Sequence, residues 1–309
     1  MYTKPVKTVA ELLEKLKEKW FVITPREEGL IKSFLENTGY YHVSSYMKSF
    51  FNPDKKEDKV QKKDIPFRNV INLYRQDRKL QSFLIWLLLH IEVFLKAKFI
   101  HITCEKYWSP FWYLDQTNLF KSCDDLVNDI ILNNKKSHIL TNYKEKYWKN
   151  EPFPLWHIVE VASFWPFSDF FVHTKQEINT EFYKMFNFWG DIYYKQFLWW
   201  LHGLCRLRNR VAHSEISRSM RLLPQIKLPY IKASINSLTA YICLIYLFLK
   251  IENQEFADSF FHELLICLED IAKIDGLTFP EKQRIGINGK RKDTILRWKK
   301  KIDTDKNHK

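Results

Sequence analysis

The stretch Phe67–Tyr107 carries apolar side chains at the spacing of an α-helix over some forty positions. The recurring residues are Leu73, Leu80, Leu84, Leu87, Leu88, Ile91 and Leu95. Intervals of three and four place them on one side of a helix, so we expect the longest helix of the chain here, broken at most once. The 309 residues include only seven glycines and eleven prolines, whereas all-β folds need turn residues roughly every 8–12 positions. The sequence therefore predicts an all-α fold.

Further helices are predicted from their ends. Thr8 and Glu11 have the spacing of a capping box at the start of Val9–Trp20. Thr24-Pro25 suits the start of a second helix, which ends at Asn37-Thr38-Gly39. The other expected helices are Leu155–Phe164, Phe167–His173 after a break at Pro166, Phe197–Ala212, and an antiparallel pair, Ile231–Lys250 and Gln254–Lys273.

A polar segment, Asn52–Asp64, mixes charges of both signs and has almost no apolar content, which is typical of a solvated loop. We place a domain boundary there. The predicted units are an N-terminal helical module at residues 1–52, a helical domain at 65–275 and a basic C-terminal extension at 276–309. That extension is the most basic segment, since Lys282–Lys309 holds eleven Lys and Arg against three Asp.

The charge balance favours a polyanionic partner. The chain has 49 Lys and Arg against 36 Asp and Glu, a formal net charge of +13, which suits nucleic acid or an acidic lipid surface. Phe83–Leu89 and Leu238–Leu249 are the longest apolar runs, and both are shorter than the roughly 20 residues that a bilayer requires. We therefore expect no membrane association.

Five cysteines without a C-x-x-C pair suggest neither a disulfide framework nor a structural zinc site. The N-terminus lacks the apolar core of an export signal. We therefore expect a cytoplasmic protein. No glycine-rich phosphate loop or clustered Asp pair for magnesium is visible either, and we expect no cofactor and no metal.

The segment Leu207–His213 is the strongest candidate for chemistry. Its arginine and histidine suit a phosphodiester, because a guanidinium binds phosphate oxygens and an imidazole moves protons near neutral pH. RNA carries its own nucleophile, the 2′-hydroxyl. We assign proton transfer to His213, phosphate binding to Arg208, and orientation of the imidazole or the phosphate to Asn209.

One histidine cannot easily act as both base and acid. Arg208 to His213 is the only R-x4-H spacing in the chain. A two-fold dimer with these helices facing each other would bring two histidines and two arginines into one cleft. We therefore predict a homodimer with a composite site. The alternative is a satisfied polar cluster at a buried interface, because such a spacing also arises by chance.

Several segments together resemble the Abi-like abortive-infection proteins of the AbiD and AbiF type, a branch of the HEPN superfamily. They are Lys4-Pro5 with Thr8, Thr38–Tyr46, Leu73–Leu80, Ile91–Val93, Pro154–Trp156 with Glu160, Ser163-Phe164 with Ser168, Trp200-Leu201 and Arg208–His213. Their order spans nearly the whole chain.

This resemblance implies an HEPN-type helical bundle, a metal-independent endoribonuclease motif of the form R-x4-H, homodimerisation, and a toxin-like role in antiviral defence. It also implies that a structured noncoding RNA is a possible partner. The chain departs from the family pattern at Ser214, which stands where a second histidine is usual and is followed by Glu215, and at Lys96, where an arginine is common.

Other residues are candidates for RNA binding. The basic extension interleaves cations with one aromatic residue, in Lys290, Arg291, Lys292, Arg297, Trp298 and Lys299, which suits an RNA backbone with one stacked base. Trp298 can instead anchor the extension to the body. Tyr40 and Tyr41 can stack bases or pack in the core. Lys96 can face RNA or form an intrahelical ion pair with Glu92.

The sequence also allows two other functions. In the first, the protein has the same fold but a catalytically inactive motif, and it holds a cognate RNA without cutting it. Alternatively, the chain would be the antitoxin or target of a partner that transfers nucleotidyl or phosphoryl groups.

Overall fold

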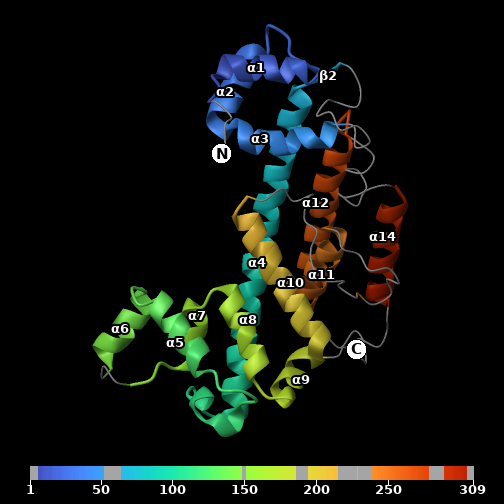
Figure 1. The fold of residues 1–309 in the computed structure, drawn as a ribbon. Helices are drawn as coiled ribbons and strands as arrows, with labels where there is room; N and C mark the ends of the chain where they lie inside the picture. The colour runs from blue at the N-terminus through green and yellow to red at the C-terminus, as the bar shows by residue number, and fades with distance from the viewer. Residues whose placement is uncertain are drawn as a thin grey trace.

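In the computed structural model the chain is all-α, as the sequence predicts. The structure describes residues 6–51, 64–147, 151–185, 194–214, 228, 238–277 and 289–304. Its axis is α4, Arg68–Tyr107, an uninterrupted helix of 40 residues, and Figure 1 shows the other helices arranged along it. Within the described ranges the only strands are β1, Phe21–Val22, and β2, Ile65–Pro66, which pair in parallel.

The N-terminal helices pack against the first half of α4. They are α1 (Val9–Glu18), α2 (Glu28–Thr38), α3 (Tyr40–Met47) and the 3₁₀ helix η1 (Lys48–Phe50). The capping box of Thr8 and Glu11 is present. The second helix starts later than predicted, because the N–H of Glu27 bonds the carbonyl of Thr24 in a turn before the helix begins. Gly39, with φ of 78°, then lets the chain turn directly into α3.

A lobe made of α5, α6 and α7 projects from the second half of α4 (Figure 1). The elements of this region are η2 (Trp112–Leu114), η3 (Gln116–Asn118), α5 (Asp124–Asn133), α6 (His138–Lys146), α7 (Leu155–Val161), α8 (Phe164–His173) and α9 (Gln176–Lys184). The predicted break at Pro166 is wrong. The chain breaks at Ala162-Ser163, and Pro166 lies in the first turn of α8, where a missing N–H costs no intrahelical hydrogen bond.

The remaining helices are α10 (Tyr194–Ala212), α11 (Leu238–Glu252), α12 (Gln254–Ala272) and α14 (Gly289–Thr304). Helices α10, α11 and α12 pack on α4, and α14 packs on α11. Asn253 caps α12 through a bond from the Phe256 N–H and is the only residue between α11 and α12. These two helices pack against each other as the predicted antiparallel pair, while residues 231–237 of the predicted first helix lie outside the described residues.

Nearly all buried apolar side chains of the described residues form one continuous cluster from Leu13 to Ile302. The segment at 52–63, where a domain boundary is predicted, lies outside the described residues, and the division into three units stays a prediction. Among the described helices, none combines the length and the apolar character that crossing a membrane requires.

Candidate functional site

The motif lies at the C-terminal end of α10, where this helix packs along the middle of α4. One side of α10 is buried in the core, through Phe197, Trp200, Leu201, Leu204 and Leu207. This packing leaves the last turn of the helix, and the residues directly after it, at the edge of the bundle (Figure 1).

His213 directly follows the last residue of α10, and its N–H bonds the carbonyl of Asn209 at 2.9 Å. Its side chain is exposed, and no side-chain hydrogen bond or ion pair to it occurs within the described part of the chain. Ser214 then takes a left-handed conformation, with φ of 60°, and ends the helix. The imidazole is therefore accessible to a ligand. Glu215 lies outside the described residues.

Arg208 points toward α4 and is restrained there. Its Nη1 donates to Oδ1 of Asn209 at 3.2 Å, and its Nε lies 3.8 Å from Oε2 of Glu92. The side chain keeps 27% of its surface exposed. Glu92 restrains the guanidinium on the side of α4, while part of the side chain stays exposed to solvent. This arrangement suits an arginine that is held in place while it binds an anion.

Glu92 is shared between two cations. Its Oε1 accepts a bond from Lys96 Nζ at 2.9 Å, and Lys96 also donates to the carbonyl of Ala162 at 2.6 Å. Lys96 is thus buried and paired within its own helix, and the expectation that it faces RNA is wrong. The alternative reading, an intrahelical ion pair, is what the structure shows. The other carboxylate oxygen of Glu92 faces Nε of Arg208. Glu92 therefore positions the guanidinium.

Arg78 was not predicted as part of the site. Its Nη2 donates to the carbonyl of Ser214 at 2.9 Å, and its guanidinium lies 5.5 Å from the centroid of the Tyr74 ring. Arg78 thereby holds the chain directly after His213. The sequence signal was its distance of fourteen residues from Glu92, nearly four full turns, which places both on one side of α4.

His202 is a second histidine on α10 that sequence reasoning missed. It stacks on Trp165, with ring centroids 5.0 Å apart and planes 18° apart, and its Nε2 lies 3.7 Å from Asp169 Oδ1. His202 and His213 are eleven residues apart, about three turns, so they share the solvent side of α10. They are about 16 Å apart along the helix axis, too far to act on one phosphate.

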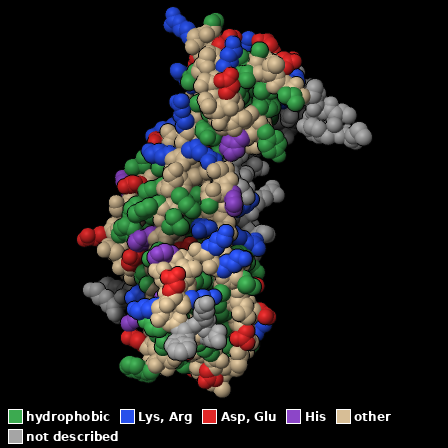
Figure 2. Space-filling model, turned by 90° about the vertical axis from the view of Figure 1, so that its left-hand side faces the viewer, with side chains coloured by type: hydrophobic (Ala, Val, Ile, Leu, Met, Phe, Trp, Pro, Cys, Tyr) green, Lys and Arg blue, Asp and Glu red, His purple; other side chains and the backbone are tan. Residues whose placement is uncertain are grey.

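Helix α3 adjoins the site through Arg78. The Tyr46 hydroxyl donates to buried Asp77 at 2.7 Å, and the His42 ring packs edge-on against Tyr74. Burial, followed by the neighbouring charge of Arg78, lowers the pKa of His42 below its usual value. Figure 2 views the molecule from the left-hand side of Figure 1. Near mid-height of this face, histidine and basic side chains lie beside a group of hydrophobic side chains.

The predicted tyrosines differ in their exposure. Tyr41 is 90% exposed. Tyr40 is partly buried, and the ammonium group of Lys15 lies 4.8 Å from its ring centroid. Tyr41 is therefore the tyrosine of this pair that is open to a base.

The basic extension is anchored to the body, and its tryptophan is not free to stack on a base. Trp298 is 2% exposed and packs edge-on against Tyr246. Lys299 forms ion pairs with Asp258 and Asp303. The prediction that Trp298 stacks on RNA is thus wrong, because α14 buries this ring against α11, and Lys299 is used for docking.

The other predicted residues of the extension remain candidates. Arg297 is exposed, and its Nε donates to the carbonyl of Asp293, one turn earlier. Lys290, Arg291 and Lys292 lie in the first turn of α14, and their side chains are outside the described residues. In Figure 1 α14 lies on the other side of the molecule from the lobe and is separated from the end of α10 by α11 and α12.

Comparison with known proteins returned one family. A family model described as Abi-like protein matches residues 33–216, more than half of the chain. The matched segment runs from within α2 to just beyond the motif, and so it includes α4, α10 and the residues around Arg208 and His213 described above. Searches of the curated proteins and of the solved structures returned no match.

Proposed function

Because this chain belongs to the Abi-like protein family, we propose that it acts in abortive infection as an HEPN-type endoribonuclease that works without a metal ion. Its substrate is RNA, and its catalytic residues are Arg208, Asn209 and His213. The chain works as a homodimer in the cytoplasm, and a structured noncoding RNA is its regulatory partner. The net charge of +13 favours RNA as the polyanion.

The observation that carries this proposal is the exposed His213 imidazole directly after α10, five residues beyond Arg208, whose guanidinium is restrained by Glu92. An imidazole there can remove the proton of a 2′-hydroxyl, and the Arg208 guanidinium can stabilise the charge that develops on the phosphate. Asn209, bonded to Arg208, orients the guanidinium.

A second copy of the chain supplies the missing acid. Cleavage needs one group to take a proton and another to donate one to the leaving oxygen. His202 is too far away along α10, so the second imidazole is His213 of the partner copy, related by a two-fold axis. Leu89 and Val93, on the α4 segment that carries Glu92, are 43% and 67% exposed, and we propose that they form the dimer contact.

The activity test compares purified protein with the His213→Ala variant on total RNA in the presence of EDTA. We expect cleavage by the parent and a loss of about 100-fold or more in the variant, since acid–base catalysis contributes on the order of 10²–10⁴-fold. His262→Ala, which removes an exposed histidine on α12, is the matched control and retains activity. If the parent and the His213→Ala variant are equally inactive, the proposed nuclease activity is refuted.

A catalytically inactive RNA-binding protein of the same fold is the second candidate. The observation that favours it is the restraint of Arg208 by Glu92 and Asn209, which suits holding an anion as well as cutting beside it. In that case RNA co-purifies with the protein and stays intact, and His213→Ala leaves binding unchanged. A high ratio of absorbance at 260 to 280 nm, followed by sequencing, identifies the bound RNA.

A further inference from the structure

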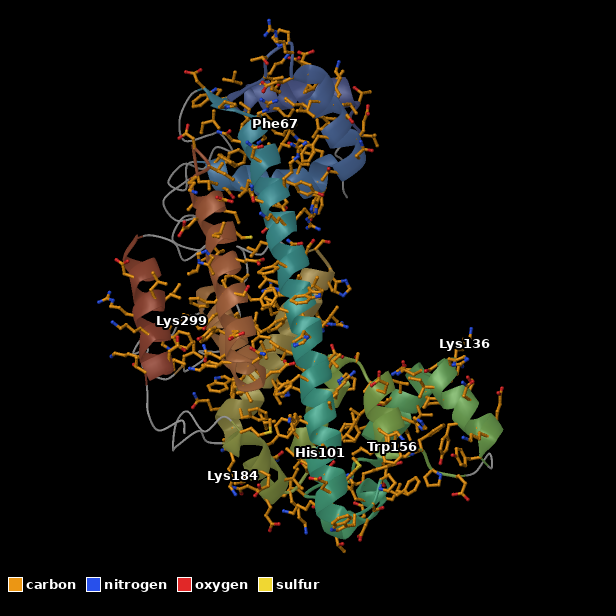
Figure 3. The ribbon with its side chains drawn as sticks, turned by 180° about the vertical axis from the view of Figure 1, so that it is seen from behind. Phe67, His101, Lys136, Trp156, Lys184 and Lys299 are labelled. Carbon is orange, nitrogen blue, oxygen red and sulfur yellow. The ribbon has the colours of Figure 1, made fainter. Side chains whose placement is uncertain are left out.

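A cavity of about 620 Å³ lies where the lobe meets α4, outside the motif. Its walls come from α6, from α7 and from Ile100 of α4. Its size falls within the range of sites for small organic groups, roughly 300–1,000 Å³. Figure 3 marks the region with Trp156 on α7, close to α4, and Lys136 at the outer part of the lobe.

Aromatic rings form much of the cavity wall. Tyr143, on α6, and Tyr147, directly after this helix, have ring centroids 4.7 Å apart, and His157 stands edge-on to Tyr143 at 5.0 Å. Trp156, which is 43% exposed, completes this group. Half-exposed flat rings around an open cavity favour a flat ligand that stacks on them.

The cavity also contains polar groups without partners. Nδ1 of His157 is buried and has no hydrogen bond, and Glu160 forms no ion pair, as far as the described residues extend. Burial lowers the pKa of His157 below its usual value, which favours the neutral ring, and a neutral imidazole offers one donor and one acceptor. Glu160 is an acceptor for an amino group. These groups match the edge of a nucleobase.

The cavity carries opposite charges on its two sides. Lys146 lines it on the α6 side and Glu160 on the α7 side. This arrangement favours a phosphate near Lys146 and an amino group near Glu160. His138 and His157 also line the cavity.

The cavity is connected to the motif through α4 and α7. The carbonyl of Ala162, directly after α7, accepts the bond from Lys96, and Lys96 pairs with Glu92 beside Arg208. Ile100 is eight residues beyond Glu92, about 12 Å along the helix axis. One RNA strand lying along this side of α4 can reach both places.

We propose that this cavity binds one unpaired nucleotide, with its base stacked among Tyr143, Tyr147 and Trp156 and its edge bound by His157 and Glu160. The nucleotide belongs to the RNA whose phosphate lies at Arg208, so the inference builds on the proposed function. The cavity would then select RNAs that carry an unpaired base at one defined distance from the phosphate bound at Arg208.

The test measures binding, not cleavage, in the full-length His213→Ala protein. A fluorescently labelled single-stranded oligoribonucleotide and, separately, adenosine, guanosine, cytidine and uridine monophosphates are titrated, and affinities are compared with those of Trp156→Ala and Tyr147→Ala. Both side chains are about half exposed, so the variants are expected to fold, which thermal unfolding checks. Phe120→Ala removes an 81% exposed ring that does not line the cavity and is the control.

We expect each cavity variant to weaken oligoribonucleotide binding about tenfold, because one stacked base contributes roughly 1–3 kcal/mol, while the control binds normally. If RNA binds with unchanged affinity to both variants, the cavity proposal is overturned and the proposed function stands. This holds also when the variants lose only monophosphate binding, because the cavity then takes a free nucleotide and not one of the bound RNA. If neither RNA nor any monophosphate binds, both fail.

Discussion

Glu92 shows how a single buried residue supports the site. It faces Lys96 and Arg208 in a region where water screens charges poorly. Nε of Arg208 and Oε2 of Glu92 are both buried and have no hydrogen bond within the described residues, so each depends on the other for compensation of its charge. Removal of the carboxylate leaves two cations close together without a counter-charge.

We therefore expect Glu92→Gln to lower the free energy of unfolding by roughly 3–5 kcal/mol, as measured by urea denaturation. Glu105→Gln is the control, since this carboxylate lies on the same helix and pairs with His101 at a site where both are 64% exposed. Its effect is expected within about 0.5 kcal/mol. Equal effects of the two substitutions contradict the role given to Glu92.

At the scale of elements, α14 shows how a charged helix docks on an apolar body. Ile295, Trp298 and Ile302 are buried against the core, and polar contacts surround them. Asp303 accepts bonds from Lys250 at 2.8 Å and from Lys299 at 2.6 Å. Burial alone would raise the pKa of Asp303, but these bonds hold it below its usual value.

Docking of α14 is consequently expected to weaken in acid. A carboxyl whose pKa is lowered by folding stabilises the fold above its unfolded pKa of about 3.9 and loses this contribution as pH falls through the lower folded value. Because the chemical rate of amide exchange itself falls in acid, the quantity to compare is the protection factor, and the protection factors of the α14 amides should decrease below about pH 4. At pH 7, Lys299→Ala should accelerate hydrogen exchange of these amides roughly tenfold, since a charge-assisted bond contributes about 1.5–3 kcal/mol. Lys300→Ala, at the exposed neighbour, should leave it unchanged.

At the scale of the whole molecule, the proposed dimer depends on the exposed apolar side of α4. Val93→Glu places a charge there without disturbing the core, because 67% of this side chain is exposed. We expect a dimer in the parent and a monomer in the variant by light scattering after size exclusion, together with loss of cleavage. Leu132→Glu changes a similarly exposed apolar residue on α5 and should remain dimeric. If the parent protein is monomeric and still cleaves RNA, the proposal of an active site shared by two copies is contradicted.

Local signals predicted much of the fold. The spacing of leucines predicted α4, and the capping box at Thr8 predicted the start of α1, because periodicity and capping act over a few neighbouring residues. The break before α8 was misplaced at Pro166, since proline is tolerated in a first turn as well as after a helix. The R-x4-H motif was found from its spacing, but Arg78, 136 residues from Ser214 in the chain, was not.

The sequence by itself determined most of the helical segments and the spacing that puts Arg208 in the last turns of α10 and His213 directly after this helix. Those properties depend on residues within a few turns of each other. The tertiary structure decided which side chains stay accessible: it buried Trp298 and Lys96, left His213 open, and brought Arg78 to Ser214. Burial depends on which helix covers which surface, and the contacts that choose this arrangement join residues far apart in the chain.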